Sequence, residues 1–308
     1  MQDIIMFRTG NRFFRKRGSI FAGLFLMAFL MGCSGQGKDL DDGLPGYPLT
    51  GEILEIREEE GSLLVQHDEI EGYMPAMTML FRVAPSDLAN AEVGARIRAR
   101  LIQEEGGSFR LERIWPADET TERTLTHLNR RLREDTVIRG AAAYRDVGEE
   151  MPRFALFDQS GALVRPERFS GKSVVVNFIF TRCPDPHMCP AATQRMIQLQ
   201  QVAREEGIKD FELLSITLDP EYDTPGVLRQ YAENLHIDLE NYSFLTGPEG
   251  AVRDLMTQLG ILTREDDGPL IQHTMATILV DADGRILHRV DGSEWMVGDF
   301  LNRLKASQ

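Results

Sequence analysis

The sequence has very few cysteines. Among 308 residues, only Cys33, Cys183 and Cys189 are cysteine, too few for the disulfide framework that holds many small exported domains together. Five residues separate Cys183 from Cys189. A bridge across so short a loop would add little stability compared with a long-range crosslink. A redox or metal-binding role is therefore favoured over a structural one for this pair.

Basic residues are outnumbered by acidic ones, and long apolar segments are lacking. The chain has 34 Lys and Arg residues against 48 Asp and Glu residues, a formal net charge of −14 at pH 7, which argues against a nucleic-acid partner. Its N-terminal apolar stretch, Ser19–Met31, has 13 residues, whereas a transmembrane helix needs roughly 20. The sequence contains no glycine-rich phosphate loop and no Ser/His/Asp arrangement.

Residues 1–32 have the features of an export signal. Basic residues precede the short apolar stretch, which ends in Leu30-Met31-Gly32-Cys33. This ending resembles the bacterial lipobox, which implies that Cys33 becomes the acylated first residue of the mature chain. The alternatives are an uncleaved anchor or an ordinary signal peptide. With residues 33–47 as a tether, we expect a periplasm-facing protein of the cell envelope, held on the membrane by lipid.

Residues 48–116 predict a small all-β domain. Glu- and Gly-rich turns separate short runs of strand-forming residues, and strands are expected at 53–56, 62–66, 77–83, 95–102 and 109–114. Such an arrangement suits a small OB-like barrel. Residues 117–147 are charged, with Leu125, Leu128 and Leu132 at helical spacing, which predicts a helical or partly flexible connector.

Strands and helices alternate over residues 148–308. The continuous apolar run 173–180 is typical of a buried parallel strand, and we expect a helix at 191–206 and a second strand at 211–218. A hairpin is expected around the tight turn at 281–284, followed by a last helix. This order predicts an α/β domain of the thioredoxin-like class.

Cys183, Cys189 and His273 form the first candidate site. The cysteines follow the predicted central strand, and His273 precedes the predicted hairpin. Two thiols and one imidazole make a soft three-ligand site suited to monovalent copper, whereas structural zinc uses four ligands. The start of the following helix and Arg182 are expected to lower the thiol pKa values. Whether other residues join the site stays open; the candidates are His187, Met188 and Asp219.

This domain resembles the Sco/SenC family of copper proteins. The matching segments are Asn177–Pro184, Cys189-Pro190, Ser215–Glu221, Asp223–Pro225 and Gln272–Thr274. The resemblance implies that Cys183, Cys189 and His273 bind copper, as Cu(I) or Cu(II), and that the cysteines can also cycle to a disulfide. It further implies a role in delivering copper to, or preparing, the CuA site of a cytochrome c oxidase subunit. The family usually has three residues between its cysteines, whereas this chain has five.

The second candidate site lies in the predicted barrel. Met77, Met79 and Phe81 share one face of a strand because side chains alternate along it, and His67 and Met74 precede them. Thioethers cannot form disulfides and suit Cu(I). The segment resembles the CusF-type periplasmic copper-binding barrel, which implies that His67, Met77 and Met79 are ligands. Met74 stands at that family's copper-facing Trp and is either a further ligand or a packing residue. A Met-rich core stripe is the alternative.

Together these patterns predict a lipid-anchored copper metallochaperone with two soft-metal sites. Two other functions fit the same residues. In one, Cys183 and Cys189 act as a periplasmic thiol–disulfide reductase on partner cysteines. In the other, the protein buffers copper or confers copper resistance without a dedicated client.

Overall fold

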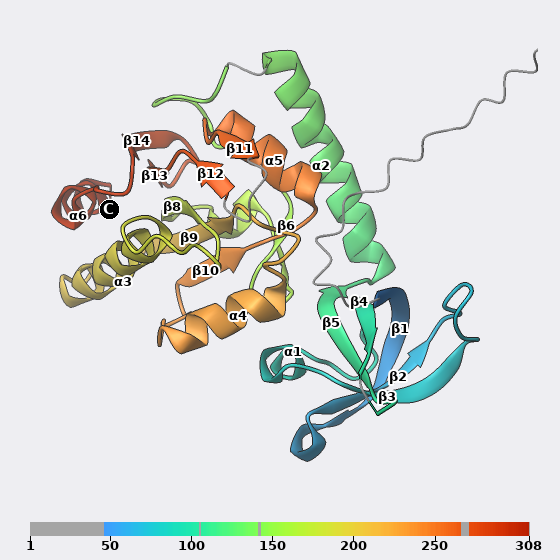
Figure 1. Ribbon diagram of the computed structural model, residues 1–308. Coiled ribbons are helices and arrows are strands. Elements are labelled where there is room, and N and C mark those ends of the chain that lie inside the picture. Colours follow the sequence, from blue (N-terminus) through green and yellow to red (C-terminus); the bar gives the residue numbers. More distant parts are fainter. Residues whose placement is uncertain (1–45, 105, 141–142, 266–270, 308) are drawn as a thin grey trace, which may run out of the picture. The chain divides into compact units, whose positions relative to one another are not determined.

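The computed structural model describes residues 46–104, 106–140, 143–265 and 271–307 (Figure 1). The expected signal peptide, the lipidation site Cys33 and all but the last two residues of the expected tether lie outside these ranges. Within them, no helix combines the length and the apolar character needed to cross a membrane.

The N-terminal part of the described chain is a closed five-stranded barrel, in agreement with the predicted OB-like domain. Its strands pair in the order β1-β2-β3-β5-β4. They are β1 (Gly46–Arg57), β2 (Ser62–His67), β3 (Met77–Arg82), β4 (Arg96–Gln103) and β5 (Phe109–Pro116). Two short helices, η1 (Glu58–Glu60) and α1 (Pro85–Ala89), lie in the connections β1–β2 and β3–β4. Alternate residues of the strands form a separate apolar core that includes Leu63, Val65 and Phe81.

One glycine allows two barrel strands to approach closely. Gly51 of β1 pairs directly with His67 of β2. A Cβ atom at Gly51 would lie 2.7 Å from a methyl group of Val65 and 2.9 Å from the Cα of His67. The absence of a side chain at Gly51 therefore allows β1 to lie close to His67, the last residue of β2.

The second sheet has the strand order β10-β9-β8-β13-β14. The strands β8 (Ser173–Ile179), β9 (Phe211–Thr217) and β10 (Tyr242–Leu245) are parallel, and β13 (Ala276–Val280) and β14 (Ile286–Asp291) form the antiparallel hairpin. Every residue of β8 and β9 is buried, as expected for central strands that are covered on both faces. The sheet and its helices form the predicted thioredoxin-like domain.

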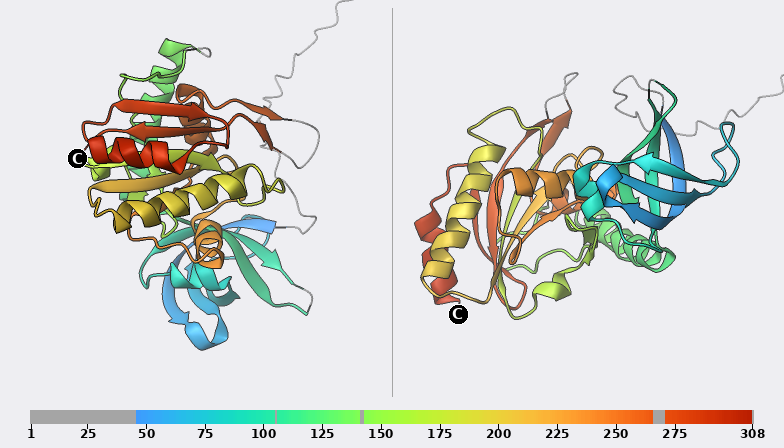
Figure 2. Two further views of the ribbon diagram at one scale, coloured as in Figure 1. Left: turned by 90° about the vertical axis from the view of Figure 1, so that its left-hand side faces the viewer. Right: turned by 90° about the horizontal axis from the view of Figure 1, so that it is seen from below.

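The described residues of this domain form four α-helices and two small two-stranded sheets beside the main sheet. The helices are α3 (Cys189–Glu205), α4 (Pro225–Asn234), α5 (Glu249–Gln258) and α6 (Val297–Ala306). The helices α3 and α6 pack side by side (Figure 2). Short strands also pair β6 (Leu156–Phe157) with β7 (Leu163–Val164), before the turn η2 (Pro166–Phe169). The strand β11 (Thr263–Glu265) pairs with β12 (Ile271–His273).

The charged segment after the barrel contains the long helix α2 (Glu119–Arg139). Asp118 caps its start by accepting a hydrogen bond from the Thr121 N–H at 2.8 Å. Leu125 and Leu132 are buried, and α2 packs against α5. Arg133 adds an ion pair to Asp254 at 2.8 Å. The packing, rather than intrinsic propensity alone, accounts for a helix of this length.

Candidate metal centre

The loop from β8 to α3 carries both cysteines of the predicted site. Cys189 is the first residue of α3 and is fully buried, whereas Cys183 lies in the loop and is half-buried. Both thiols are free. Asp185 shapes the turn between them, because its carboxylate accepts the backbone N–H of His187 at 2.8 Å. The side chain of His187 is exposed, and that of Met188 is half-buried.

His273 ends β12 and meets the buried cysteine. Its Nδ1 lies 3.0 Å from the carbonyl oxygen of Thr274, which can only accept, so Nδ1 carries the proton of the neutral ring. The free Nε2 lone pair then lies 3.8 Å from the Sγ of Cys189. Phe180 packs edge-on against the imidazole at 5.6 Å between ring centres. Burial lowers the pKa of His273, which favours the neutral form that binds metals.

The electrostatics of Cys189 correct one prediction from the sequence. Burial raises the pKa of the Cys189 thiol, and the neighbouring Cys183 acts in the same direction. The expected lowering by the helix start is outweighed because the sulfur has lost its contact with water. Arg182 does not help, because its guanidinium pairs with Asp219 at 2.6 Å and lies 4.0 Å from the ring centre of Tyr222. A thiolate at Cys189 therefore requires a compensating positive ion.

The fold brings the three predicted ligands, Cys183, Cys189 and His273, into one region, but the three side chains do not converge on a single metal position. Cys189 is the shared member, since Cys183 affects its pKa and His273 faces its sulfur. Among the described residues, no three His, Cys, Asp or Glu side chains converge closely enough to form a ready metal site. The carboxylate of Asp219 faces Arg182.

The predicted barrel site is organised around His67 at the end of β2. His67 is 1% exposed, and its Nδ1 lies 2.7 Å from the carbonyl oxygen of Asp68. Its Nε2 is buried and has no hydrogen-bond partner among the described residues. An orphaned buried nitrogen is costly unless something else satisfies it. The chemistry of this donor fits a soft metal ion held together with thioether sulfurs.

The strand register brings the methionines to this imidazole. His67 pairs with Met77 and Val65 pairs with Met79, so both thioethers lie on the same face as the ring. Met79 packs partly into the barrel core, whereas Met77 is exposed. Met74 is half-buried and is fixed by two backbone hydrogen bonds with Ile70.

Two features near these sites were not predicted. Tyr73 stacks on Tyr47, with ring centres 3.8 Å apart, beside Met74 in the loop before β3. Asp223 is fully buried beside the cysteine loop and accepts hydrogen bonds from Thr181 and Thr217. In the sequence, the buried role of Asp223 was indicated only by its position four residues after Asp219, in the turn that follows a buried strand.

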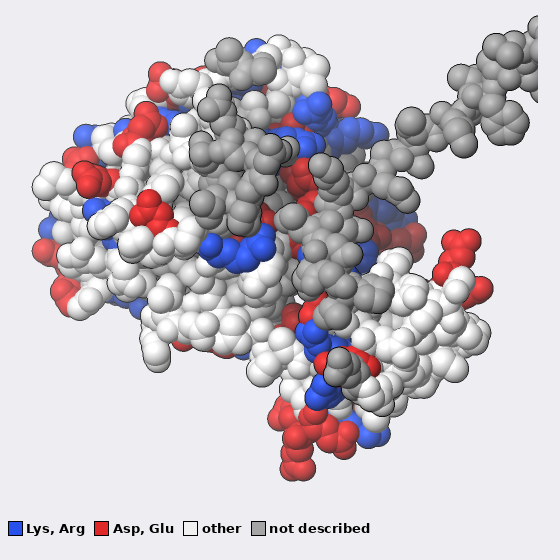
Figure 3. All heavy atoms as spheres, in the orientation of Figure 1, with Lys and Arg blue, Asp and Glu red and all other residues white. Residues whose placement is uncertain are grey.

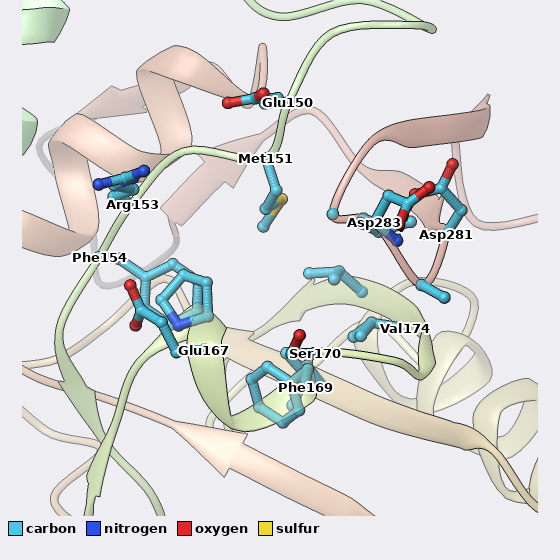
Figure 4. Close-up of a pocket in the computed structure, with 16 residues that line it drawn as sticks. Glu150, Met151, Arg153, Phe154, Glu167, Phe169, Ser170, Val174, Asp281 and Asp283 are labelled. Atoms are coloured by element: carbon cyan, nitrogen blue, oxygen red, sulfur yellow. Dashed lines mark hydrogen bonds between the residues drawn. The ribbon is translucent and has the colours of Figure 1, made fainter.

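A cavity of about 380 Å³ lies beside the central strands of the second sheet and the β13–β14 turn (Figure 4). Its lining includes Val174 near the start of β8 and Asp281 and Asp283 of the β13–β14 turn. Cys183 follows the opposite end of β8, so the cavity contains none of the candidate ligands. On the face of the molecule in Figure 3, acidic and basic side chains are interspersed.

Comparison with known proteins gives two family matches. Residues 142–306 match the family model described as SCO1/SenC, which is more than half of the chain. Residues 46–116 match the model described as copper binding periplasmic protein CusF. The two matches cover the thioredoxin-like domain and the barrel separately.

The chain is also similar to individual proteins. The SCO1 protein homolog of Bacillus subtilis is 30% identical over 148 residues, which cover 47% of this chain and 75% of that protein. A SCO1/SenC family lipoprotein from Bacillus anthracis is 24% identical, with a TM-score of 0.49 and coverage of 54% of this chain and 99% of that one. BsSco, described as a member of the Sco family of cytochrome c oxidase assembly proteins, is 28% identical with a TM-score of 0.47, covering 53% and 96%.

Proposed function

Because the chain belongs to the SCO1/SenC family and binds copper, we propose that it is a metallochaperone for the CuA site of a cytochrome c oxidase. Cys183, Cys189 and His273 hold the copper that is delivered. The observation that carries the proposal is the approach of the His273 Nε2 lone pair to the Cys189 sulfur at 3.8 Å. BsSco, a relative by sequence, is described as an oxidase assembly protein.

The chemistry of the cysteine site suits a cargo ion. The pKa of Cys189 is raised by burial, so the thiol keeps its proton until copper arrives and replaces it. The neutral imidazole of His273 needs to lose no proton. Copper binding therefore releases the proton of Cys189, and a proton given up by the acceptor's own thiols as they take the ion can return to Cys189 and favour release. A site with such coupling can bind a soft ion and also give it up.

The barrel supplies a second copper site of different chemistry. His67, Met77 and Met79 are its ligands, and Met74 is placed to join them. Thioethers stay unprotonated and do not form disulfides, so this site keeps Cu(I) in an oxidising compartment. The barrel thus serves as the acquisition site of a protein that Cys33 anchors, through lipid, to the periplasmic face of a membrane.

A thiol–disulfide reductase is the second candidate, favoured by two free thiols that lie close enough for Cys183 to affect the pKa of Cys189. In that function the half-buried Cys183 attacks a partner disulfide, and Cys189 resolves the mixed disulfide. The partner gains two electrons and two protons, and the pair becomes a disulfide. The raised pKa of Cys189 suits a resolving thiol better than an attacking one.

One transfer experiment separates the candidates. The mature chain, reduced and loaded with Cu(I), is mixed with the copper-free soluble CuA domain of an oxidase subunit, either reduced or as its disulfide. A chaperone fills the reduced acceptor with Cu(I), so the CuA absorption spectrum appears once added ferricyanide has removed one electron from the two-copper site, and Cys183→Ser abolishes this. A reductase without copper converts the acceptor disulfide to thiols but delivers no metal. Transfer in neither case, with oxidase assembly unaffected by deletion at low copper, would leave copper buffering as the function.

A further inference from the structure

The position of Cys183 depends on residues outside the ligand set. Cys189 is held by helix α3, and His273 by the β11–β12 hairpin. Cys183 lies in the loop, where its N–H donates to the Phe180 carbonyl at 3.2 Å and its thiol lies 3.9 Å from the Asp185 carbonyl oxygen. The contacts that hold Thr181 and Arg182, the two residues before Cys183, therefore influence how far its sulfur lies from the other two ligands.

A buried carboxylate fixes the first of these residues. Asp223 is fully buried, and one of its oxygens accepts the Thr181 N–H at 3.1 Å. The Thr181 hydroxyl donates to its other oxygen. The Thr217 hydroxyl at the end of β9 donates to the first oxygen at 2.5 Å. Three donors satisfy one buried charge, so the contact is directional and costly to rearrange.

The second residue is held by the same turn. Arg182 donates to Asp219 at 2.6 Å, and the backbone N–H of Asp219 donates to the Thr217 hydroxyl at 2.9 Å. The N–H of Asp223 donates to the Asp219 carbonyl at 2.8 Å. Two acidic residues of one turn thus hold two consecutive residues of the cysteine loop: Asp223 bonds to Thr181, and Asp219 bonds to Arg182. Because the Arg182 side chain is 41% exposed, the buried Asp223 contact is the stronger constraint.

We propose that Asp223 is the positioning residue of the copper site, acting through Thr181 to set the place of Cys183. The proposal rests on the proposed function. Asp223 itself touches none of the three ligands through a hydrogen bond in the described structure. Its carboxylate makes the loop stiff enough for Cys183 to meet copper in one geometry, which is the usual task of residues that support metal ligands.

The test uses the mature full chain and a signal that only the cysteine site gives. Cu(II) bound by thiolate produces a charge-transfer absorption band, which the His/Met barrel site cannot produce. Titration of this band with a competing chelator gives the affinity of the cysteine site. Asp223→Asn keeps the size of the side chain but cannot accept all three hydrogen bonds. We expect it to lower this affinity by about tenfold or more.

Asp158→Asn is the matched control. Asp158 is also a buried carboxylate, 4% exposed, and it accepts hydrogen bonds from Ser160, Ala162 and Arg168 in a different turn. We expect Asp158→Asn to lower the stability of the fold but to change the copper affinity of the cysteine site by no more than about twofold. An equal loss of affinity in both variants would overturn the proposal, since it would show a general effect of instability. Unchanged affinity in folded Asp223→Asn would overturn it as well.

A milder variant covers the case in which Asp223→Asn does not fold. Thr181→Val removes the hydroxyl donor but keeps the backbone N–H, and we expect it to lower the affinity by about threefold, in the range of one hydrogen bond. No change in Thr181→Val would then count against the proposal. Absence of the thiolate–copper band in the wild-type protein would remove the proposed function together with this inference. A normal wild-type band that the variants leave unaltered would remove the inference alone.

Discussion

The imidazole Nε2 of His273 lies 3.8 Å from the sulfur of Cys189, although 84 positions separate the two residues in the chain. The contact is produced by two independent elements, the start of α3 and the end of β12. The hydrogen bond from Nδ1 to Thr274 directs the ring so that its free lone pair faces the thiol. The same arrangement recurs at His67, whose Nδ1 bonds to Asp68.

The first prediction is that the two copper sites are lost separately. We expect His273→Ala to lower the copper affinity of the cysteine site by at least about tenfold and to leave the barrel site intact. Met79→Leu, which keeps the volume, should do the reverse. Copper titration of the reduced mature protein measures both. Met196→Leu, at a buried methionine of α3, is the control and should change neither; loss of both sites in one ligand variant would contradict the assignment.

The second prediction concerns pH. The raised pKa of Cys189 means that copper must displace its proton, so affinity at the cysteine site should rise with pH. Each proton released gives about a tenfold gain per pH unit. The lowered pKa of His273 means that the imidazole adds no competing proton near neutral pH. Chelator competition at pH 6.5, 7.25 and 8 checks the slope, and a flat profile would contradict the raised pKa of Cys189.

Much of the fold was predictable because it depends on local patterns. The apolar run 173–180 became β8, and the turn at 281–284 joined β13 to β14. The expected helix 191–206 begins two residues earlier, at Cys189. That shift matters because it places the thiol inside the helix start and away from water, where desolvation raises its pKa.

The remaining features arise from contacts between distant segments. The hairpin β11–β12 that presents His273 has short strands and no clear alternation. The thiol pKa could not be predicted from neighbouring charges, because it depends on burial by the whole domain. The barrel register was different: alternation along β3 correctly placed Met77, Met79 and Phe81 on one face, and pairing with β2 then brought them to His67. Their role as ligands stays a prediction.

The third prediction uses the close approach at Gly51. An added Cβ would meet Val65 at 2.7 Å and the His67 Cα at 2.9 Å, so Gly51→Ala must push β1 away from β2. We expect a loss of about 1–3 kcal/mol in the free energy of unfolding, as for other overpacked sites. Weaker Cu(I) binding by the barrel should accompany it, because His67 moves.

Gly250→Ala is the control for this glycine. Gly250 lies in α5, and a Cβ there would meet nothing closer than 3.9 Å. Alanine is the better helix former, so stability should stay the same or rise by up to about 1 kcal/mol. Urea unfolding and Cu(I) titration of both variants provide the comparison. Equal behaviour of the two variants would mean that the strand contact at Gly51 can relax without cost.

The fourth prediction is a loss of stability with rising pH that depends on Asp87. Burial, with a contribution from the Glu112 carboxylate, raises the pKa of Asp87 from 3.8 to about 7. Between these values the folded protein keeps a proton that the unfolded chain has released, so raising the pH favours unfolding. The effect is absent below about pH 4 and complete above about pH 7. One pKa unit corresponds to about 1.4 kcal/mol, and partial solvent exposure of this side chain reduces the total to about 2 kcal/mol.

Asp87→Asn should therefore stabilise the protein at pH 8 and have little effect at pH 4, as measured by urea unfolding. Glu92→Gln, at an exposed position nearby, should show no such difference, and a stabilisation of Asp87→Asn that is equal at both pH values would contradict the ionisation mechanism.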